Sequence, residues 1–138
     1  MFTRIRFLLL VCLCLNIPLF MGFTHNIGTF FRASSCSGTV VSGYCWYYGG
    51  SSQSCTSVCS SHGGYDVATK DYAGSGGTTT TCSEVLSALG VGGGAISHGC
   101  EGQAVGCAKV VLLNARCSGS TTAGAAFPLT SRACACKN

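Results

Sequence analysis

The stretch YCWYYGGSSQSCTSVCSSHGG, residues 44–64, decides the fold of this chain. It opens with aromatic residues of strand character, passes through a turn of glycine and serine, and continues into an expected helix over residues 53–62. Ser52 or Ser54 can cap the start of that helix, and Gly63 stands where a left-handed residue ends a helix. The stretch therefore predicts a strand, a turn and a short helix in direct succession.

The cysteines of this helix match those of the last predicted strand, residues 130–136, in their spacing. Cys55 and Cys59 are four residues apart, so they share one helical face at about 6 Å from each other. Cys134 and Cys136 are two residues apart and leave one face of a strand about 7 Å apart. Neither pair bonds internally without distortion. The geometry therefore predicts that two disulfide bonds join the final strand to the first helix.

Further elements follow from local patterns. Residues 38–48 are rich in β-branched and aromatic side chains and predict a strand, which Ser42 and Gly43 bend or fold into a hairpin. Thr81 and Glu84 form a capping box that predicts a second helix, ended by a glycine. The apolar stripe of that helix consists of Cys82, Val85, Leu86 and Leu89.

The remaining segments complete the fold class. The run KVVLLN, residues 109–114, is apolar between its first and last residues and predicts a central strand. Residues 65–80 predict a strand-like or irregular link, and residues 90–99 predict a glycine loop. We therefore expect an α+β fold, a small disulfide-rich domain in which two short helices pack on short antiparallel strands.

The N-terminus predicts export. Residues 1–22 carry two arginines and no acid near their start, and continue into a short apolar run that a proline breaks. This is the pattern of a secretory signal peptide, and the run is too short to span a bilayer comfortably. Small residues place the cleavage between residues 22 and 35, so that residues 23–35 are a linker and residues 36–138 a cysteine-rich domain. The alternative is an N-terminal anchor that is not cleaved.

Cysteine content predicts how the domain is stabilised. An exported domain this small cannot bury enough apolar area alone, so a high cysteine content normally means a disulfide framework. Cys36 and Cys45 are expected to form a disulfide that closes a short local loop. The four cysteines between residues 82 and 117 can pair in three ways, and the sequence does not choose among them. The close pairs lack the spacing of a zinc ribbon, so no metal ion or cofactor is expected. The expected disulfide cysteines are Cys36, Cys45, Cys55, Cys59, Cys82, Cys100, Cys107, Cys117, Cys134 and Cys136.

Charged residues are few and scattered singly along the expected domain. No basic stripe marks a surface for nucleic acid or for an anionic membrane. We therefore expect no nucleic-acid partner, no membrane span after processing, and an extracellular location.

Several landmarks follow one another along the chain: Cys36 and Cys45 around an aromatic strand, Cys59 before Gly63 and Gly64 in the first helix, and Cys107 entering an apolar strand ahead of Cys117. This order of parts resembles a C-type-lectin-like domain over most of residues 36–136. The resemblance implies the architecture of that family. The family's calcium site needs a proline motif and a Trp-Asn-Asp motif that this chain lacks, so calcium-dependent sugar binding is not implied. The resemblance also implies that Cys117 is the partner of Cys107 and that Cys134 or Cys136 bonds to the first helix.

Aromatic residues of the opening strand are the candidates for ligand binding. Alternation places Tyr44, Trp46 and Tyr48 on one face and Tyr47 on the other. An exposed aromatic face beside hydroxyl-rich loops suits stacking on sugar rings. The alternative is that Trp46 and its alternate neighbours fill the small core. The candidate ligand-binding residues are Tyr44, Trp46, Tyr47, Tyr48, Gln53, Gln103 and Asn114.

These features predict a secreted, non-catalytic module that binds an extracellular glycan or a protein surface. No acid–base pair is visible beside His62 or His98, and an even number of cysteines leaves no thiol for a nucleophile, so no enzymatic activity is expected. The alternative is a structural or adhesive surface component that self-associates, favoured by low charge and many glycines and serines. A small secreted hydrolase or toxin-like effector ranks last.

Overall fold

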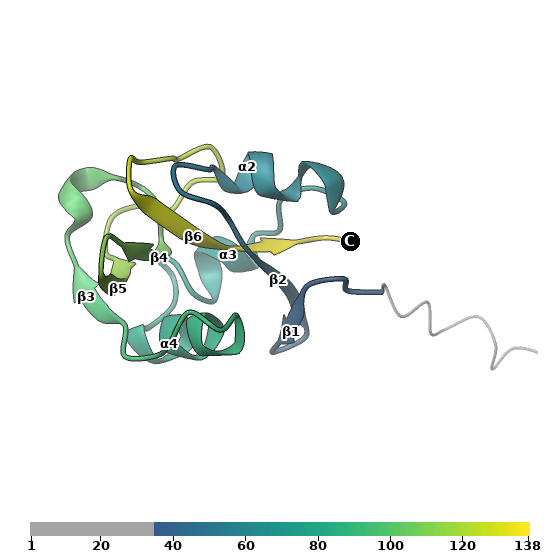
Figure 1. Ribbon diagram of the computed structural model, residues 1–138, viewed down its shortest axis with the longest axis horizontal. Coiled ribbons are helices and arrows are strands. Elements are labelled where there is room, and N and C mark those ends of the chain that lie inside the picture. The colour runs from purple at the N-terminus through teal and green to yellow at the C-terminus, as the bar shows by residue number, and fades with distance from the viewer. Residues whose placement is uncertain (1–34) are drawn as a thin grey trace, which may run out of the picture. The chain divides into compact units, whose positions relative to one another are not determined.

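The computed structural model describes residues 35–138; the predicted signal peptide and nearly all of the predicted linker lie outside the described residues. Six strands form one sheet in the order β1-β2-β6-β4-β5-β3 (Figure 1). Neighbouring strands are antiparallel except β3 and β5, which are parallel. The strands are β1 (Thr39–Val41), β2 (Tyr44–Tyr48), β3 (Ile96–His98), β4 (Cys107–Val110), β5 (Leu113–Cys117) and β6 (Thr130–Cys136).

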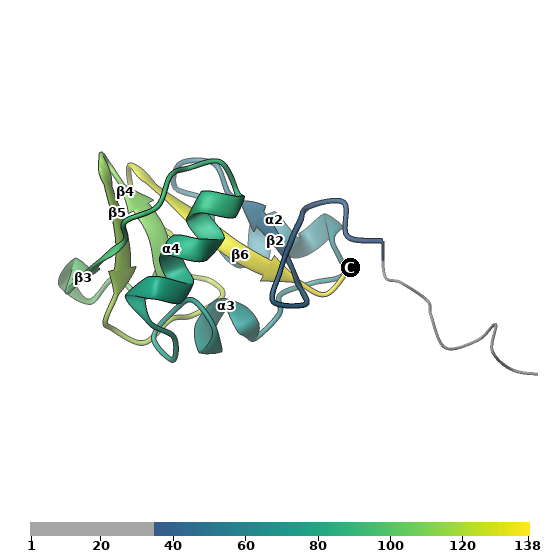
Figure 2. The ribbon, with the colours of Figure 1, turned by 90° about the horizontal axis from the view of Figure 1, so that it is seen from below.

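Short helices cover the two faces of the β2–β6 pair. One face carries α2 and η1, and the other carries α3 and α4 (Figures 1 and 2). The predicted class, a small disulfide-rich α+β domain, is confirmed. The helices are α2 (Cys55–Val58), α3 (Ala68–Asp71) and α4 (Thr79–Ala88), with short 3-10 turns η1 (Cys59–Ser61) and η2 (Cys100–Gly102).

Strand β6 is the centre of the domain because both of its faces are covered. Ala133 and Ala135 face the core that Trp46 and α4 fill, and small side chains let these elements approach closely. Cys134 and Cys136 face α2 and η1. The predicted double connection is confirmed: Cys55 bonds to Cys134 and Cys59 to Cys136, each with Cα atoms 5.3 Å apart.

The other three disulfides join strands of the sheet to segments that pack beside it. Cys36 bonds to Cys45, as expected, Cys82 to Cys107, and Cys100 to Cys117. The pairing of Cys107 with Cys117 that the family resemblance implies is therefore wrong. Its physical reason is that Cys107 packs toward α4, whereas Cys117 packs with a separate cluster around Val105, so their side chains lie on opposite faces.

The predicted elements of the first half are largely present. Ser42 and Gly43 turn β1 into β2, and both residues have positive φ. The Ser54 hydroxyl accepts from the Ser57 N–H at 3.1 Å and caps α2, which ends in η1 before Gly63 at φ 72°.

Helix α4 begins earlier than the predicted capping box. Thr78 is the cap residue: its Oγ1 accepts from the Thr81 N–H at 3.1 Å, and the Thr81 Oγ1 accepts from the Thr78 N–H at 2.9 Å. Glu84 therefore lies within the helix and is exposed rather than engaged in a cap. The predicted apolar stripe is correct, since Cys82, Val85 and Leu86 are buried and Leu89 is partly buried.

The prediction of one central strand over residues 109–114 is wrong. Strand β4 ends at Val110, a two-residue turn of Val111 and Leu112 follows, and β5 begins at Leu113. Continuous apolar character suggested burial on both faces, but these residues form an exposed hairpin turn. The sequence pattern also missed α3 within residues 65–80 and β3 within the glycine loop.

A buried arginine, Arg132, forms hydrogen bonds to backbone carbonyls of the loops beside β4 and β6. Arg132 on β6 donates from Nε to the Val105 carbonyl at 2.7 Å, from Nη2 to the Thr122 carbonyl at 3.0 Å, and from Nη1 to the Ala125 carbonyl. Burial lowers the pKa of Arg132 to about 10, so the guanidinium remains charged at neutral pH.

Candidate functional site

The most exposed ring of the predicted aromatic set belongs to Tyr44, at the start of β2. Its side chain is 40% exposed, and its ring centroid lies 5.9 Å from that of Tyr72, with the planes tilted by 47°. The Trp46 ring lies 6.1 Å from the same Tyr72 ring and supports it from the core. Tyr44 and Tyr72 therefore form an aromatic surface over a buried tryptophan.

Two polar side chains adjoin these rings. The Tyr72 hydroxyl donates to Glu84 Oε2 at 2.7 Å. Ser42 Oγ lies 2.7 Å from the same hydroxyl and donates to it, because the tyrosine proton is directed at the carboxylate. We call Ser42, Tyr44, Tyr72 and Glu84 the Tyr44–Tyr72 cluster. It combines an aromatic surface with a carboxylate and a hydroxyl.

Three elements position the cluster, each for a local reason. The β1–β2 hairpin carries Ser42 and Tyr44, and the Trp46 Nε1–H donates to the Val41 carbonyl at 3.2 Å, which holds the hairpin on the core. Tyr72 follows α3, and the Thr81 hydroxyl of α4 donates to its carbonyl at 2.6 Å. The short link between α3 and α4 is thus fixed at both ends.

The same contacts change the acidity of Tyr72. The hydrogen bond from Ser42 lowers the pKa of the Tyr72 phenol, but the hydrogen bond to the Glu84 carboxylate, burial, and the charges of Glu84 and Tyr44 together raise it above its ordinary value. Tyr72 is therefore a neutral hydrogen-bond donor at physiological pH.

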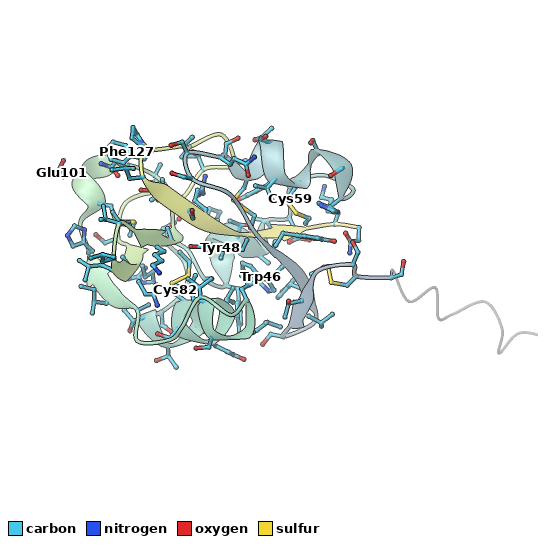
Figure 3. All side chains as sticks on the ribbon, viewed as in Figure 1. Trp46, Tyr48, Cys59, Cys82, Glu101 and Phe127 are labelled. Carbon is cyan, nitrogen blue, oxygen red and sulfur yellow. A yellow bond between two sulfur atoms is a disulfide. The ribbon has the colours of Figure 1, made fainter. Side chains whose placement is uncertain are left out.

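Trp46, the central residue of the predicted ligand set, is part of the core. Its side chain has no exposed area and lies between β2 and α4 (Figure 3). The reason is that its face of β2 is the one that α4 covers, so the core interpretation of Trp46 is correct and a ligand cannot stack on this ring. Tyr47 points to the other face, where it stacks on His62 at 3.8 Å and donates to Asn138 Oδ1 at 2.7 Å.

Tyr48 and Gln53 lie at the far end of β2 from Tyr44. Tyr48 is 37% exposed; burial raises its phenol pKa, although a hydrogen bond with Ser131 lowers it in part. The Gln53 side-chain oxygen accepts from the Gly50 N–H at 2.7 Å and so closes the turn between β2 and α2. Gln53 has a structural contact of its own.

Gln103 and Asn114 come from other parts of the domain. Gln103 follows η2, and the Asn114 Nδ2 on β5 donates to the carbonyls of Gly92 and Gly93 at 2.8 and 3.0 Å. Asn114 therefore anchors the glycine loop. Of the seven predicted ligand residues, the structure places only Tyr44 in the Tyr44–Tyr72 cluster.

Sequence reasoning missed the other members of the cluster. Tyr72 lies in a segment that the pattern predicts to be strand-like or irregular, and the pattern assigns Glu84 to a helix cap. The run of four threonines, residues 78–81, offers several capping residues. With the cap placed at Thr78, Glu84 has no capping role, and its side chain is available for another contact. No local signal links Ser42 to Tyr72, because 30 residues separate them.

A second feature lies at the opposite end of the sheet. An apolar pocket of about 290 Å³ is lined by His98, Val110, Val111, Leu112, Leu113 and Ala115. His98 supplies its only polar side chain, and the His98 Nδ1 accepts from the Cys100 N–H at 2.9 Å. The lining contains no carboxylate that could form an acid–base pair with this histidine.

Residues 35–138 show neither a metal site nor a membrane-spanning helix. Within that range, no three His, Cys, Asp or Glu side chains come together as a metal site. No helix in the same range has the length and apolar character needed to cross a bilayer.

Comparison of the chain with protein families, with curated proteins and with solved structures finds no match. The C-type-lectin-like resemblance therefore stays a prediction. The fold and disulfides define a small cysteine-rich α+β domain with five bridges, compatible with an extracellular protein.

Proposed function

We propose that this domain is a secreted, non-catalytic module that binds an extracellular glycan at the Tyr44–Tyr72 cluster. The observation that carries the proposal is the exposed Tyr44 ring packed against Tyr72, whose hydroxyl donates to the Glu84 carboxylate at 2.7 Å. A protein surface that presents a similar apolar and hydroxyl-bearing patch is the second candidate ligand.

The chemistry of the cluster suits a sugar ring. An aromatic face is electron-rich, so it attracts the C–H groups on the apolar face of a pyranose. Glu84 is exposed and offers acceptor oxygens to sugar hydroxyls, and the Ser42 hydroxyl lies on the same rim. A few placed polar groups beside an apolar surface are the usual means of fixing the orientation of a small ligand.

Rigidity of the cluster also supports binding. Tyr72 is held by two hydrogen bonds at its hydroxyl and by Thr81 at its carbonyl, and the Cys36–Cys45 bridge ties down the hairpin that carries Tyr44. Little conformational entropy is then lost when a ligand orders these side chains.

Secretion is part of the proposal because of the cysteines. All ten cysteines of residues 35–138 are in disulfides, which persist in oxidising compartments. A basic start followed by an apolar run supports the same location. Mass analysis of the N-terminus of the exported protein tests it, with a new terminus between residues 22 and 35 expected.

Glycan-array screening followed by calorimetry on the best ligand tests the binding site. Tyr44→Ala is expected to abolish measurable binding, and Glu84→Gln to weaken it on the order of tenfold, the loss of one hydrogen bond to a charged group. Tyr48→Ala is the matched control, because Tyr48 is nearly as exposed but lies outside the cluster. Binding that survives Tyr44→Ala and fails in Tyr48→Ala would contradict the assignment.

A further inference from the structure

Five exposed apolar side chains gather where two turns meet at the β4–β5 end of the domain. Leu112 is 85% exposed and Leu129 69%, and the Val111 N–H donates to the Leu129 carbonyl at 3.1 Å, which brings the turns together. Phe127 is labelled at this end of the domain, away from the C-terminus (Figures 1 and 3). We call Val111, Leu112, Leu113, Phe127 and Leu129 the apolar tip.

Two residues of the apolar tip have a backbone conformation that is unfavourable for their side chains. Val111 has φ 54° and Leu129 has φ 59°, the left-handed region in which glycine or asparagine is preferred. A β-branched residue in this conformation is an outlier, and here its side chain is exposed, so burial does not compensate for the strain. The apolar side chains at the tip therefore call for an explanation outside folding.

Both turns are free of charge. Residues 110–114 and 119–131 contain no acidic or basic side chain, and the first charge along the hairpin is Lys109. Such an uncharged tip complements a hydrocarbon environment rather than a charged partner surface. A single lysine adds little electrostatic attraction, so the contact would depend on apolar burial.

Part of the backbone at the tip is already satisfied. The Val111 N–H bonds to Leu129, the Thr130 N–H bonds to the Phe127 carbonyl at 3.2 Å, and Pro128 has no N–H to satisfy. This matters in a lipid environment, because an unpaired N–H or C=O in hydrocarbon carries a high free-energy cost.

From these observations we infer that the apolar tip inserts into the interfacial layer of a lipid bilayer, as a peripheral anchor of the domain. Residue 35 and Asn138, the two ends of the described chain, both lie on the side of the domain opposite the apolar tip (Figure 1). Neither end would therefore obstruct insertion of the tip. A second copy of the chain is a poorer occupant, because five side chains fall well short of the roughly 20–30 residues a side that stable interfaces use.

Sedimentation with phosphatidylcholine vesicles tests the inference on the oxidised protein. The protein is expected to bind, and raised salt is expected to leave the binding unchanged. Leu112→Asp should lower the partition coefficient on the order of tenfold or more, as expected for replacing a buried leucine by a charge. Val40→Asp is the matched control, because Val40 is 63% exposed but lies on β1, far from the tip along the sheet.

Several outcomes would overturn the inference. They are no vesicle binding by the unmodified protein, binding that raised salt abolishes, or equal losses in Leu112→Asp and Val40→Asp. A dimer in lipid-free buffer that Leu112→Asp dissociates would assign the tip to a second copy instead. The glycan proposal is tested separately, since Leu112→Asp leaves the Tyr44–Tyr72 cluster unchanged.

Discussion

The two ends of the central strand β6 are stabilised by different means. At its C-terminal end, Cys134 and Cys136 are bonded to α2 and η1, and the surrounding side chains are packed. At its N-terminal end, Thr130 follows a loop in which Leu129 is exposed and left-handed, beside an exposed hairpin turn. We refer to these as the stapled end and the tip end.

This difference separates stability from exposure within one small domain. Disulfides at the stapled end restrict the unfolded chain and reduce the apolar area that the fold must bury. The tip end can then display apolar side chains and carry backbone strain that a domain without crosslinks could tolerate less well. The following predictions test this division, from the largest expected effect to the smallest.

Removing both bridges of the stapled end should have the largest effect. A loop of 79 residues, the separation of Cys55 and Cys134, is worth about 4.5 kcal/mol. Once one of the two bridges is formed, the second closes only the short loop between neighbouring cysteines, because Cys55 and Cys59 are four residues apart and Cys134 and Cys136 two. The second bridge therefore adds roughly 2.5 kcal/mol to the free energy of unfolding. Replacing either cysteine pair by alanines should therefore cost about 2.5 kcal/mol, and replacing both pairs about 7 kcal/mol.

Guanidinium unfolding of the oxidised variants measures these values. The matched comparison away from the stapled end is Cys100→Ala with Cys117→Ala, whose separation of 17 residues predicts about 3 kcal/mol. Equal costs for the first and the second bridge removed from the stapled end would contradict the nested-loop argument.

Arg132→Met should have the next largest effect and act at the tip end. It leaves the carbonyls of Val105, Thr122 and Ala125 without their donor. One buried acceptor at Val105 and two part-buried acceptors without a donor predict a loss of about 3 kcal/mol in the free energy of unfolding, measured by urea titration. Arg132→Lys keeps the charge but cannot reach all three carbonyls, so an intermediate loss is expected; a stability unchanged in Arg132→Met would refute this role.

Val111→Asn should stabilise the domain by about 1 kcal/mol, because asparagine adopts the left-handed conformation at lower cost. The gain is read from the midpoint of thermal unfolding, and vesicle binding should fall in the same variant. Val40→Asn is the control: Val40 is exposed on β1 and does not have positive φ, so no gain is expected there. A loss of stability in Val111→Asn would show that the valine side chain is favourable for folding.

The smallest expected effect is a pH dependence at the stapled end. Burial raises the pKa of Tyr65, despite the opposing charges of Arg132 and Lys70 and a hydrogen bond with Thr69. Folding therefore favours the neutral phenol, and this contribution is complete below about pH 10 and is lost as the pH rises through the raised value. Tyr65→Phe should flatten the alkaline decline in unfolding free energy; an unchanged slope would argue against it.

Sequence patterns predicted the stapled end well because its constraints are local and periodic. The spacing of Cys55 with Cys59 and of Cys134 with Cys136 defines two faces that fit each other, and the structure pairs them accordingly. The β1–β2 hairpin and the apolar stripe of α4 follow from equally short-range patterns.

The tip end and the candidate site were beyond these patterns. The apolar run of residues 109–114 has the composition of a buried strand, and only tertiary placement shows that it is an exposed turn. The Tyr44–Tyr72 cluster joins side chains from three elements, so its contacts depend on how α3 and α4 pack against β2. Periodicity within one element carries no information on such distances.

The Arg132 guanidinium holds three loop carbonyls in the way that a bound metal ion does in other proteins. Many loop-rich extracellular proteins hold their loops around calcium, with backbone carbonyls among its ligands. Here a guanidinium occupies the equivalent position among three carbonyl oxygens, and it is covalently part of the chain. A cation of this kind cannot be removed by a chelator or lost on dilution, so these loops should keep their arrangement in calcium-poor surroundings.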